Sequence, residues 1–521
     1  MTSYQTGKSA YRRRVEGNWT ADNGKRAIID IGSNTVRMVV YGGSPRAPTV
    51  LANEKVTARL GRDLSQTGNM GDDCVELALI GLARFALILA DLGIKDVETV
   101  ATAAVRDAGN GQAFIAKVRA LGLKVRIISG KEEAQTSALG VIGAFPGAVG
   151  TVADLGGGSL ELIEISGDEP GEGSTLPLGS LRLAALREDG EDKFQSRVGK
   201  ALKQEGWKRE TGGTLFLVGG TWRTMAVLAM EQQGHPLSDP HGLCVDVGMA
   251  AKLARRTAKA SAQDLQTIPR VSSMRAQILP HAAALLGCLL KTLQPERLVF
   301  SAWGLREGLL YNRLSAAEKA QDPLLAGLSL FAGQHGAPPM LCTRIAGWTV
   351  DAVPRSSNGN ERLRLAATML SLASLQVEPN LRLNHAMDWA LYKRWLGVDD
   401  ADRAMMAAAA IANGGATGMP PILTELASTE QLELATAWGL ATRLARRLGM
   451  QSQASLQAAR LRADGGTLLL AIHESHAALS VPPVRKDMKK LAECMGLEPE
   501  IEILSDAQFT ALRTKDTSEA A

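Results

Sequence analysis

Two stretches of the chain repeat one short pattern, and this repeat limits the folds that the chain can adopt. Residues 30–39 read DIGSNTVRMV and residues 154–163 read DLGGGSLELI. In each copy an apolar run ends in an aspartate, a turn of small residues follows, and apolar residues then alternate, which is the pattern of a β-hairpin. The two copies lie 124 positions apart (154 minus 30), so the sequence predicts two similar α/β domains in tandem, each opening with its hairpin.

The segments between and after the hairpins extend this prediction. Strand-like runs at 98–101, 124–129, 214–218 and 297–301 each lead through a turn into a helix-like segment, an alternation typical of α/β sheets. From about Ser315 onward the pattern changes to long helical periodicity rich in Ala and Leu. We therefore expect a disordered tail, two α/β domains, a helical domain and a C-terminal helical or mixed domain, over residues 1–25, 26–148, 149–314, 315–440 and 441–521.

Composition excludes several classes of protein. Aromatic residues make up only 4% of the chain, so a base-stacking platform for nucleic acid is not expected. The apolar windows are either interrupted by charge or shorter than the roughly 20 residues of a membrane span, and the first 25 residues lack the apolar core of a signal peptide. The five cysteines show no CxxC spacing. We expect a cytoplasmic protein without nucleic-acid or membrane partners.

The small-residue turns of the two hairpins are candidate phosphate sites. Glycine lets backbone N–H groups approach an anion closely, and two such turns facing each other would hold a phosphate between them. The alternative is a tight hairpin that needs glycine only for its backbone angles. Because the turn occurs twice, we favour phosphate binding, with these candidate residues: Ser33, Asn34, Gly156, Gly157, Gly158 and Ser159.

The aspartate that ends each apolar run is a candidate metal ligand. A carboxylate beside a phosphate loop can hold Mg²⁺ directly or through water while the metal binds phosphate oxygens. The alternative is an aspartate that bonds only to its own turn. We favour the metal role for Asp30 and Asp154, and Glu161 is a further candidate for positioning metal or water.

Six motifs in order also carry a family resemblance. The segments 30–35, 101–110, 128–134, 154–161, 219–221 and 304–308 resemble those of the exopolyphosphatase and guanosine pentaphosphate phosphohydrolase family, over residues 26 to about 312. The resemblance implies two actin-like domains of the RNase H-like, sugar kinase and heat-shock protein superfamily. It also implies a Mg²⁺-dependent site in the cleft and stepwise release of phosphate from the end of polyphosphate.

The resemblance assigns roles to particular residues. The second glutamate of the motif SGKEEA, Glu133, corresponds to the general base that activates water, whereas the residues alone also allow Glu132 and Glu133 merely to complement a helix dipole. Arg106 corresponds to an arginine that neutralises the terminal phosphate, and Arg59 and Arg62 are further candidates for phosphate contacts.

Two regions depart from the family pattern. The usual Ser-Gly-Thr loop is here Gly219, Gly220 and Thr221, which removes one hydroxyl group but keeps the backbone cradle, with Gly220 and Thr221 as phosphate candidates. The helical C-terminal region resembles an HD-like domain, yet no His-Asp doublet occurs in the sequence, so a working HD metal site is not expected.

Basic residues gather near the C-terminus, and a track of cations would retain a long polyanion through many weak contacts. The alternative is an ordinary solvated helix surface. The candidates for this polyphosphate path are Arg443, Arg446, Arg447, Lys486, Lys489 and Lys490.

These patterns favour an exopolyphosphatase that uses Mg²⁺ and acts on inorganic polyphosphate, with a homodimer implied by the resemblance. Three alternatives stay open. The same site could remove the 5′ γ-phosphate of guanosine pentaphosphate, a sensor could bind polyphosphate or guanosine penta- or tetraphosphate without turnover, and a kinase of the same superfamily could use ATP with an acceptor.

Overall fold

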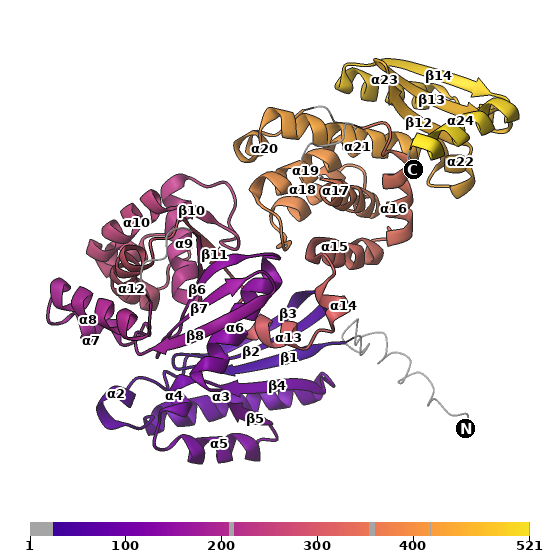
Figure 1. Ribbon diagram of the computed structural model, residues 1–521. Helices are drawn as coiled ribbons and strands as arrows, with labels where there is room; N and C mark the ends of the chain where they lie inside the picture. Colours follow the sequence, from indigo (N-terminus) through magenta and orange to yellow (C-terminus); the bar gives the residue numbers. More distant parts are fainter. Residues whose placement is uncertain (1–23, 208–212, 354–359, 417, 520–521) are drawn as a thin grey trace, which may run out of the picture. The chain divides into compact units, whose positions relative to one another are not determined.

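The computed structural model describes residues 24–207, 213–353, 360–416 and 418–519 (Figure 1). The chain divides into two compact units, with the boundary between Gln321 and Asp322. Nearly all of the expected tail, residues 1–23, lies outside the described residues, and the first strand begins at Arg26.

The first unit opens with a five-stranded sheet of order β3-β2-β1-β4-β5. Strands β1 to β3 pair antiparallel, which confirms the first hairpin, and β4 and β5 continue the sheet in parallel. Ile29 and Met38 pack on one face with helix α3, while Ile28 and Val39 pack on the other, as the period of two in a strand requires. The elements are β1 Arg26–Ile31, β2 Val36–Ser44, β3 Ala47–Val56, α2 Leu64–Thr67, α3 Asp72–Asp91, β4 Asp96–Ala101, α4 Ala103–Arg106, α5 Gly111–Ala120 and β5 Val125–Ile127.

The second sheet repeats this order. Its strands run β10-β11-β9-β6-β7-β8, so that apart from β10 at one edge they reproduce the arrangement of the first sheet. The second hairpin is β6 and β7, and the strands expected at 214–218 and 297–301 are β9 and β11. The elements are β6 Val149–Leu155, β7 Leu160–Ser166, β8 Glu169–Leu176, α7 Leu183–Arg187, α8 Glu191–Gln204, β9 Thr214–Val218, α9 Gly220–Gln233, β10 Cys244–Asp246, α10 Val247–Lys259, α11 Ala262–Gln266, α12 Ser273–Leu293 and β11 Arg297–Ser301.

Two helices cross between the sheets (Figure 1). Helix α6 (Gly130–Ala144) follows the first sheet in sequence but packs on β7 and β8 of the second, whereas α13 (Leu305–Asn312) follows the second sheet and packs on the first. Glycines permit the close crossing of these helices, because a Cβ atom on Gly308 would lie 1.7 Å from the carbonyl oxygen of Thr136. A short helix, α14 (Ala316–Lys319), follows.

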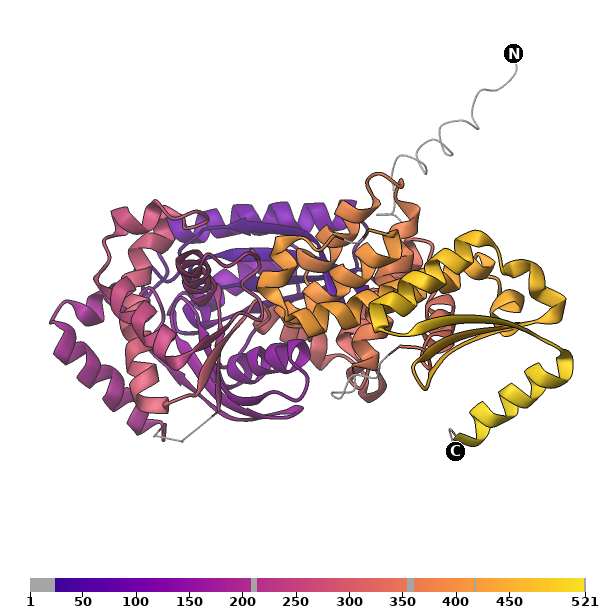
Figure 2. The same ribbon diagram turned by 90° about the horizontal axis from the view of Figure 1, so that it is seen from above.

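The second unit begins with a helical segment and ends with a small mixed sheet (Figure 2). Its sheet has the order β12-β13-β14, with β12 and β13 antiparallel and β13 and β14 parallel. The elements are α15 Pro323–Gln334, α16 Pro339–Trp348, α17 Glu361–Ala373, η2 Ser374–Gln376, α18 Arg382–Leu391, α19 Asp400–Gly414, α20 Pro421–Leu426, α21 Thr429–Gly449, α22 Gln453–Gln457, β12 Ala459–Asp464, β13 Thr467–His473, η3 Glu474–Leu479, α23 Pro482–Met495, β14 Glu498–Leu504 and α24 Asp506–Glu519.

Of the helical or mixed domain expected over residues 441–521, the structure shows the mixed alternative, so an all-α C-terminal region is wrong from Ala459 onward. The hairpin of β12 and β13 turns at Gly465 and Gly466, whose φ angles are 52° and 92°. Two adjacent residues with positive φ form the turn that joins antiparallel strands most tightly, and the sequence Asp-Gly-Gly carries that signal. The boundary expected after residue 440 is also misplaced, because it falls inside helix α21.

Helix α12 is the one helix among the described residues that has the length and apolar composition of a membrane span. Most of its apolar window is buried inside the first unit, and it contacts helices α9 and α10.

Candidate active site

The two hairpin turns have the same internal hydrogen bond and face each other. In the first turn the N–H of Gly32 donates to the carbonyl oxygen of Thr35 at 3.1 Å, and in the second the N–H of Gly156 donates to that of Ser159 at 3.0 Å. A Cβ atom on Gly157 would lie 3.0 Å from Cβ of Ser33. The turns therefore approach each other closely and border one cavity of about 180 Å³.

This cavity collects most of the predicted residues. It lies at the carboxyl ends of β1, β4, β6, β9 and β11, where ligands usually bind in open α/β sheets. The predicted residues that line it are Asp30, Ser33, Asn34, Glu133, Asp154, Gly156, Gly157, Gly158, Ser159, Glu161, Gly220 and Thr221.

The two aspartates end their strands at this cavity and carry different partners. Nη1 of Arg306 donates to Oδ2 of Asp30 at 3.1 Å, while the hydroxyl of Ser137 donates to Oδ2 of Asp154. Burial raises the pKa of both aspartates above the usual range; the charge of Arg306 acts against this rise at Asp30, as the Ser137 hydrogen bond does at Asp154. Asp30 is thus already engaged by a cation.

Glu133 stands in the first turn of α6 and is only 9% exposed. Nη1 of Arg106 donates to its Oε2 at 3.2 Å, which brings two predicted residues together. Burial raises the pKa of Glu133 to about 8; the charge of Arg106 lowers it, and the nearby carboxylates of Asp154 and Asp30 raise it further. A carboxyl group with a pKa near neutrality beside a cavity suits proton transfer.

The neighbouring Glu132 points elsewhere. It is half-buried and pairs with Arg126, and its backbone N–H donates to the hydroxyl of Ser129, which caps α6. The two alternatives considered for this glutamate pair therefore divide between the residues. Glu132 supports the helix terminus, and Glu133 lines the cavity.

Glu161 lies opposite Asp154 in the pairing of β6 with β7, and it is 2% exposed. Its Oε1 is buried and has no hydrogen-bond partner among the described residues. Burial and the nearby carboxylate of Glu133 raise the pKa of Glu161 well above its ordinary value. Such a carboxylate needs a proton or a cation, and carboxylate oxygens are the ligands that Mg²⁺ prefers.

The loop after β9 requires its first glycine. Gly219 has a φ of 114°, and a Cβ atom there would lie 2.6 Å from the carbonyl oxygen of Leu155. Gly220 begins the 14-residue helix α9, so the first backbone N–H groups of that helix open toward the cavity that Gly220 and Thr221 line. The Ser-to-Gly departure noted in the sequence thus coincides with a backbone angle that favours glycine.

Sequence analysis missed four arginines that line the same cavity: Arg37, Arg223, Arg275 and Arg306. One signal was available, because the hairpin repeat places Arg37 opposite Asp30 just as it places Glu161 opposite Asp154. Arg306 lies in the motif at 304–308 and Arg223 follows the glycine loop directly. Arg275 comes from the first turn of α12, and no motif marks it.

Comparison with known proteins agrees with this geometry. Residues 39–317, more than half of the chain, match the sequence model of the Ppx/GppA phosphatase family. The chain belongs to this family.

The chain is also similar to a curated protein and to solved structures. Over 306 residues, 56% of this chain and 89% of the relative, the sequence is 27% identical to exopolyphosphatase 1 of Mycobacterium leprae. The crystal structure of an exopolyphosphatase from Cytophaga hutchinsonii is 24% identical with a TM-score of 0.51, covering 55% of this chain and 97% of that one. The Ppx/GppA family member of Aquifex aeolicus is 26% identical with a TM-score of 0.49, covering 57% and 99%. The Cytophaga structure supports the α/β fold, and the family makes the chain a phosphatase.

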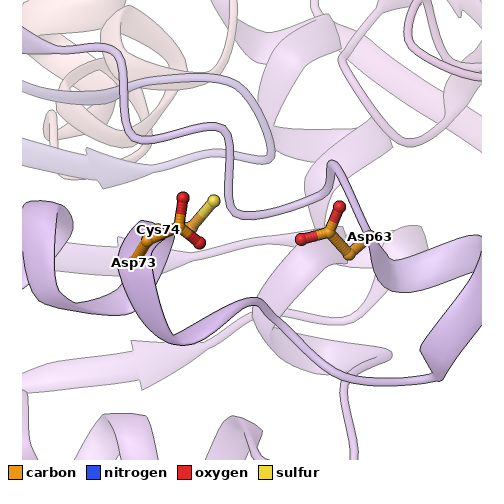
Figure 3. Close-up of side chains that lie close together, drawn as sticks. All are labelled: Asp63, Asp73 and Cys74. Atoms are coloured by element: carbon orange, nitrogen blue, oxygen red, sulfur yellow. The ribbon is translucent and has the colours of Figure 1, made fainter.

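Three predicted arginines of this Ppx/GppA protein are not among the described residues that line the cavity. Arg106 is linked to it through Glu133, whereas Arg59 and Arg62 are exposed. Arg62 lies between two carboxylates, with Nη2 2.8 Å from Asp63 and 2.9 Å from Asp73. Asp63, Asp73 and Cys74 have the spacing of a metal site (Figure 3), but the guanidinium already supplies the positive charge there.

The basic residues expected along a polyphosphate path are divided in the second unit. Arg443 and Arg447 both pair with the buried Asp487, at 3.0 and 2.8 Å, which makes them part of the packing. Arg446 donates to the carbonyl oxygen of Asn413 at 3.4 Å. On α23, Lys486 and Lys489 are exposed and Lys490 is half-buried, with Lys489 3.7 Å from Glu493.

Proposed function

We propose that this Ppx/GppA protein is an exopolyphosphatase, which releases the terminal phosphate of inorganic polyphosphate with Mg²⁺ and proceeds along the polymer. The observation that carries the proposal is the single cavity in which two phosphate-type turns meet Glu133. The names of the Mycobacterium and Cytophaga relatives point to the same substrate.

The described residues supply the chemistry of this hydrolysis. A water molecule attacks the terminal phosphorus atom, the bridging P–O bond breaks, and the shortened polymer leaves with the electron pair. Glu133, when ionised, orients the water and takes its proton. Arg106, which donates to Glu133, would offset the charge of the phosphate, while the N–H groups of the turns that line the cavity would hold its oxygens.

The carboxylates of the cavity differ in how readily each could bind a divalent cation. Asp154 and Glu161 face each other across the second hairpin, and the unpartnered Oε1 of Glu161 offers a ready ligand. Asp30 carries the guanidinium of Arg306, so we assign it to orienting that arginine as much as to the metal. When bound, Mg²⁺ would neutralise phosphate oxygens and stabilise the charge that develops on them.

The lining of the cavity favours polyphosphate over guanosine pentaphosphate. None of the described residues that border it is aromatic, and its volume is about 180 Å³. A guanine base stacks on an aromatic ring, which this lining lacks, or on an arginine plane, which would take an arginine away from the phosphates; polyphosphate can use all four arginines as charged donors. Guanosine pentaphosphate therefore becomes an outcome of the test rather than a second proposal.

We also propose how the chain is organised into domains. The repeated strand order supports two actin-like domains in tandem. The helices from Pro323 to Gln457 support an HD-like region without its His-Asp doublet, and the exposed lysines of α23 are candidates for retaining long polymers. We further propose a cytoplasmic homodimer, on the resemblance alone.

The test is phosphate release in the presence of Mg²⁺ from long-chain polyphosphate and, in parallel, from guanosine pentaphosphate. We expect rapid release from the polymer by the wild type, a loss of about 100- to 10,000-fold in Glu133→Gln, and little change in the control Glu132→Gln. Selective release from guanosine pentaphosphate would replace the proposed substrate. Tight binding of either compound without release would make the protein a sensor.

A further inference from the structure

One wall of the cavity gathers positive charge that the carboxylates of the protein offset only in part. Of the four arginines that line it, only Arg306 forms an ion pair with a described residue. Nη1 of Arg275 donates to the hydroxyl of Thr221 at 2.7 Å, and Nη1 of Arg223 donates to the carbonyl oxygen of Ala302 at 3.4 Å. Both acceptors are neutral, so neither guanidinium donates to a carboxylate of the described residues, although the charges of Glu307 and Asp154 act on Arg223 without a contact.

Two of these guanidinium groups converge on one point. A Cβ atom on Gly220 would lie 2.5 Å from Nη2 of Arg275 and 3.7 Å from Nη2 of Arg223. Gly220 begins helix α9, whose first N–H groups carry a partial positive charge. The two arginines come from different helices, α9 and α12, so the fold brings like charges together at a helix N-terminus.

This arrangement is unfavourable without an anion. Burial lowers the pKa of Arg37, Arg223 and Arg275, and the charge of a neighbouring arginine contributes in each case; for Arg223 the pKa falls to about 10. A phosphate would reverse this repulsion, because guanidinium groups and helix N–H groups are both strong donors to phosphate oxygens.

The arginine wall is distinct from the part of the cavity that holds the base. Arg106 pairs with Glu133, and Glu161 lies near Glu133, whereas the groups that act on Arg223 are Arg306, Arg37, Glu307 and Arg275. We call the part with Glu133 and Glu161 the carboxylate end and the part with the four arginines the arginine end; Asp30 and Asp154 act on groups of both ends. A single phosphate beside Glu133 leaves the arginine end unfilled.

We infer that Arg223 and Arg275, at the N-terminus of α9, form a second phosphate subsite, which binds the phosphate next to the one that is hydrolysed. This inference rests on the proposed function, since it assigns the chain direction of a condensed phosphate in the same cavity. It also names the preferred ligand class: at least two phosphates joined by an anhydride. Monoesters and free phosphate fill only the carboxylate end.

The decisive experiment is calorimetric binding to full-length Glu133→Gln with Mg²⁺, using tripolyphosphate and inorganic phosphate as probes. Arg223→Met and Arg275→Met are each added to this background, with Arg197→Met, an exposed arginine of α8 paired with Asp189, as the control. We expect each cavity variant to weaken tripolyphosphate binding by about 10- to 100-fold, as loss of a charged hydrogen bond should. Phosphate binding and the control should change by less than about twofold.

Folding of the variants is tested by melting without ligand. Because removing one of several neighbouring like charges relieves repulsion, Arg223→Met should melt at the wild-type temperature or above it. In the otherwise wild-type enzyme, the same change should raise KM for polyphosphate more than it lowers kcat, since the second phosphate is bound similarly before and during the reaction.

Two other results would contradict the proposed subsite. Equal weakening of phosphate and tripolyphosphate would place the arginines on the terminal phosphate, and unchanged tripolyphosphate binding would remove them from the site. Failure of the proposed function is separate: a wild type that releases no phosphate from polyphosphate, yet binds tripolyphosphate through Arg223, would keep the subsite and reject the enzyme.

Discussion

Replacing Glu133 by Gln should abolish activity and, at alkaline pH, stabilise the fold. The carboxyl group is buried, and its pKa rises from 4.5 to about 8. A carboxyl group whose pKa is higher in the folded state stabilises the fold fully below its unfolded pKa, and this contribution is lost as pH rises through the folded pKa. The wild type therefore loses stability between about pH 4.5 and 8, and Glu133→Gln, which cannot ionise, does not.

The size of the effect follows from these two pKa values. At about 1.4 kcal/mol per pH unit, the difference between 4.5 and about 8 amounts to roughly 4 kcal/mol at pH 8, where half of the folded molecules are ionised. Because water enters the cavity, part of this cost is relieved, and we expect about 2 to 4 kcal/mol at pH 8 and less than about 1 kcal/mol at pH 5. The melting temperature should rise by several degrees at pH 8.

Thermal unfolding at pH 5 and pH 8, in EDTA to remove any divalent cation, measures this difference. Glu132→Gln is the matched control, because it makes the same chemical change on the neighbouring residue, which is half-buried and does not line the cavity. A Glu133→Gln variant that is less stable than the wild type at pH 8, or equally shifted at both pH values, would refute the assignment of a strained buried carboxylate.

Three further changes test other parts of the structure. Arg106→Met should move the rising limb of the pH–rate profile to higher pH and lower kcat/KM about 100-fold or more, because it removes the cation that lowers the pKa of Glu133; an unmoved limb would contradict this. Gly219→Ala should lower the free energy of unfolding, measured by chemical denaturation, by about 2 kcal/mol or more, because a Cβ atom there would lie 2.6 Å from the carbonyl oxygen of Leu155 at a φ of 114°. Gly68→Ala, at an exposed glycine with open space around it, should lower that free energy by less. Asp487→Asn should destabilise the second unit by about 3 to 5 kcal/mol, seen as a lowered unfolding transition, because it leaves two arginines of α21 beside a neutral group.

The repeated hairpin explains why so much of the first unit was predictable. Strand periodicity and turn chemistry are local, and a pattern that occurs twice places both turns at equivalent points of two similar sheets. The cavity residues Ser33 and Ser159, the two aspartates and Glu133 follow from that pattern together with the family motifs.

Other residues could not be placed from the sequence, because tertiary packing decides what they contact. Arg275 reaches the cavity because α12 starts beside Thr221, 54 positions away in the chain, and no local signal records that approach. Arg443 and Arg447 have the spacing of a cationic helix surface, but both pair with the buried Asp487 of α23, which lies 40 or more positions away in the chain. The hairpin at Gly465 was different, since its turn signal was present but lay within a region dominated by helical periodicity.

The crossing of α6 and α13 gives the first unit a mechanical property. Glu133 is carried by α6 and so moves with the second sheet, while Arg106 ends α4 beside the first. Their 3.2 Å contact therefore spans the two halves of the unit. A rotation that opened the halves would separate this pair and raise the proton affinity of Glu133. In such an opened form Glu133 would hold its proton up to a higher pH than in the described form, where its pKa is about 8.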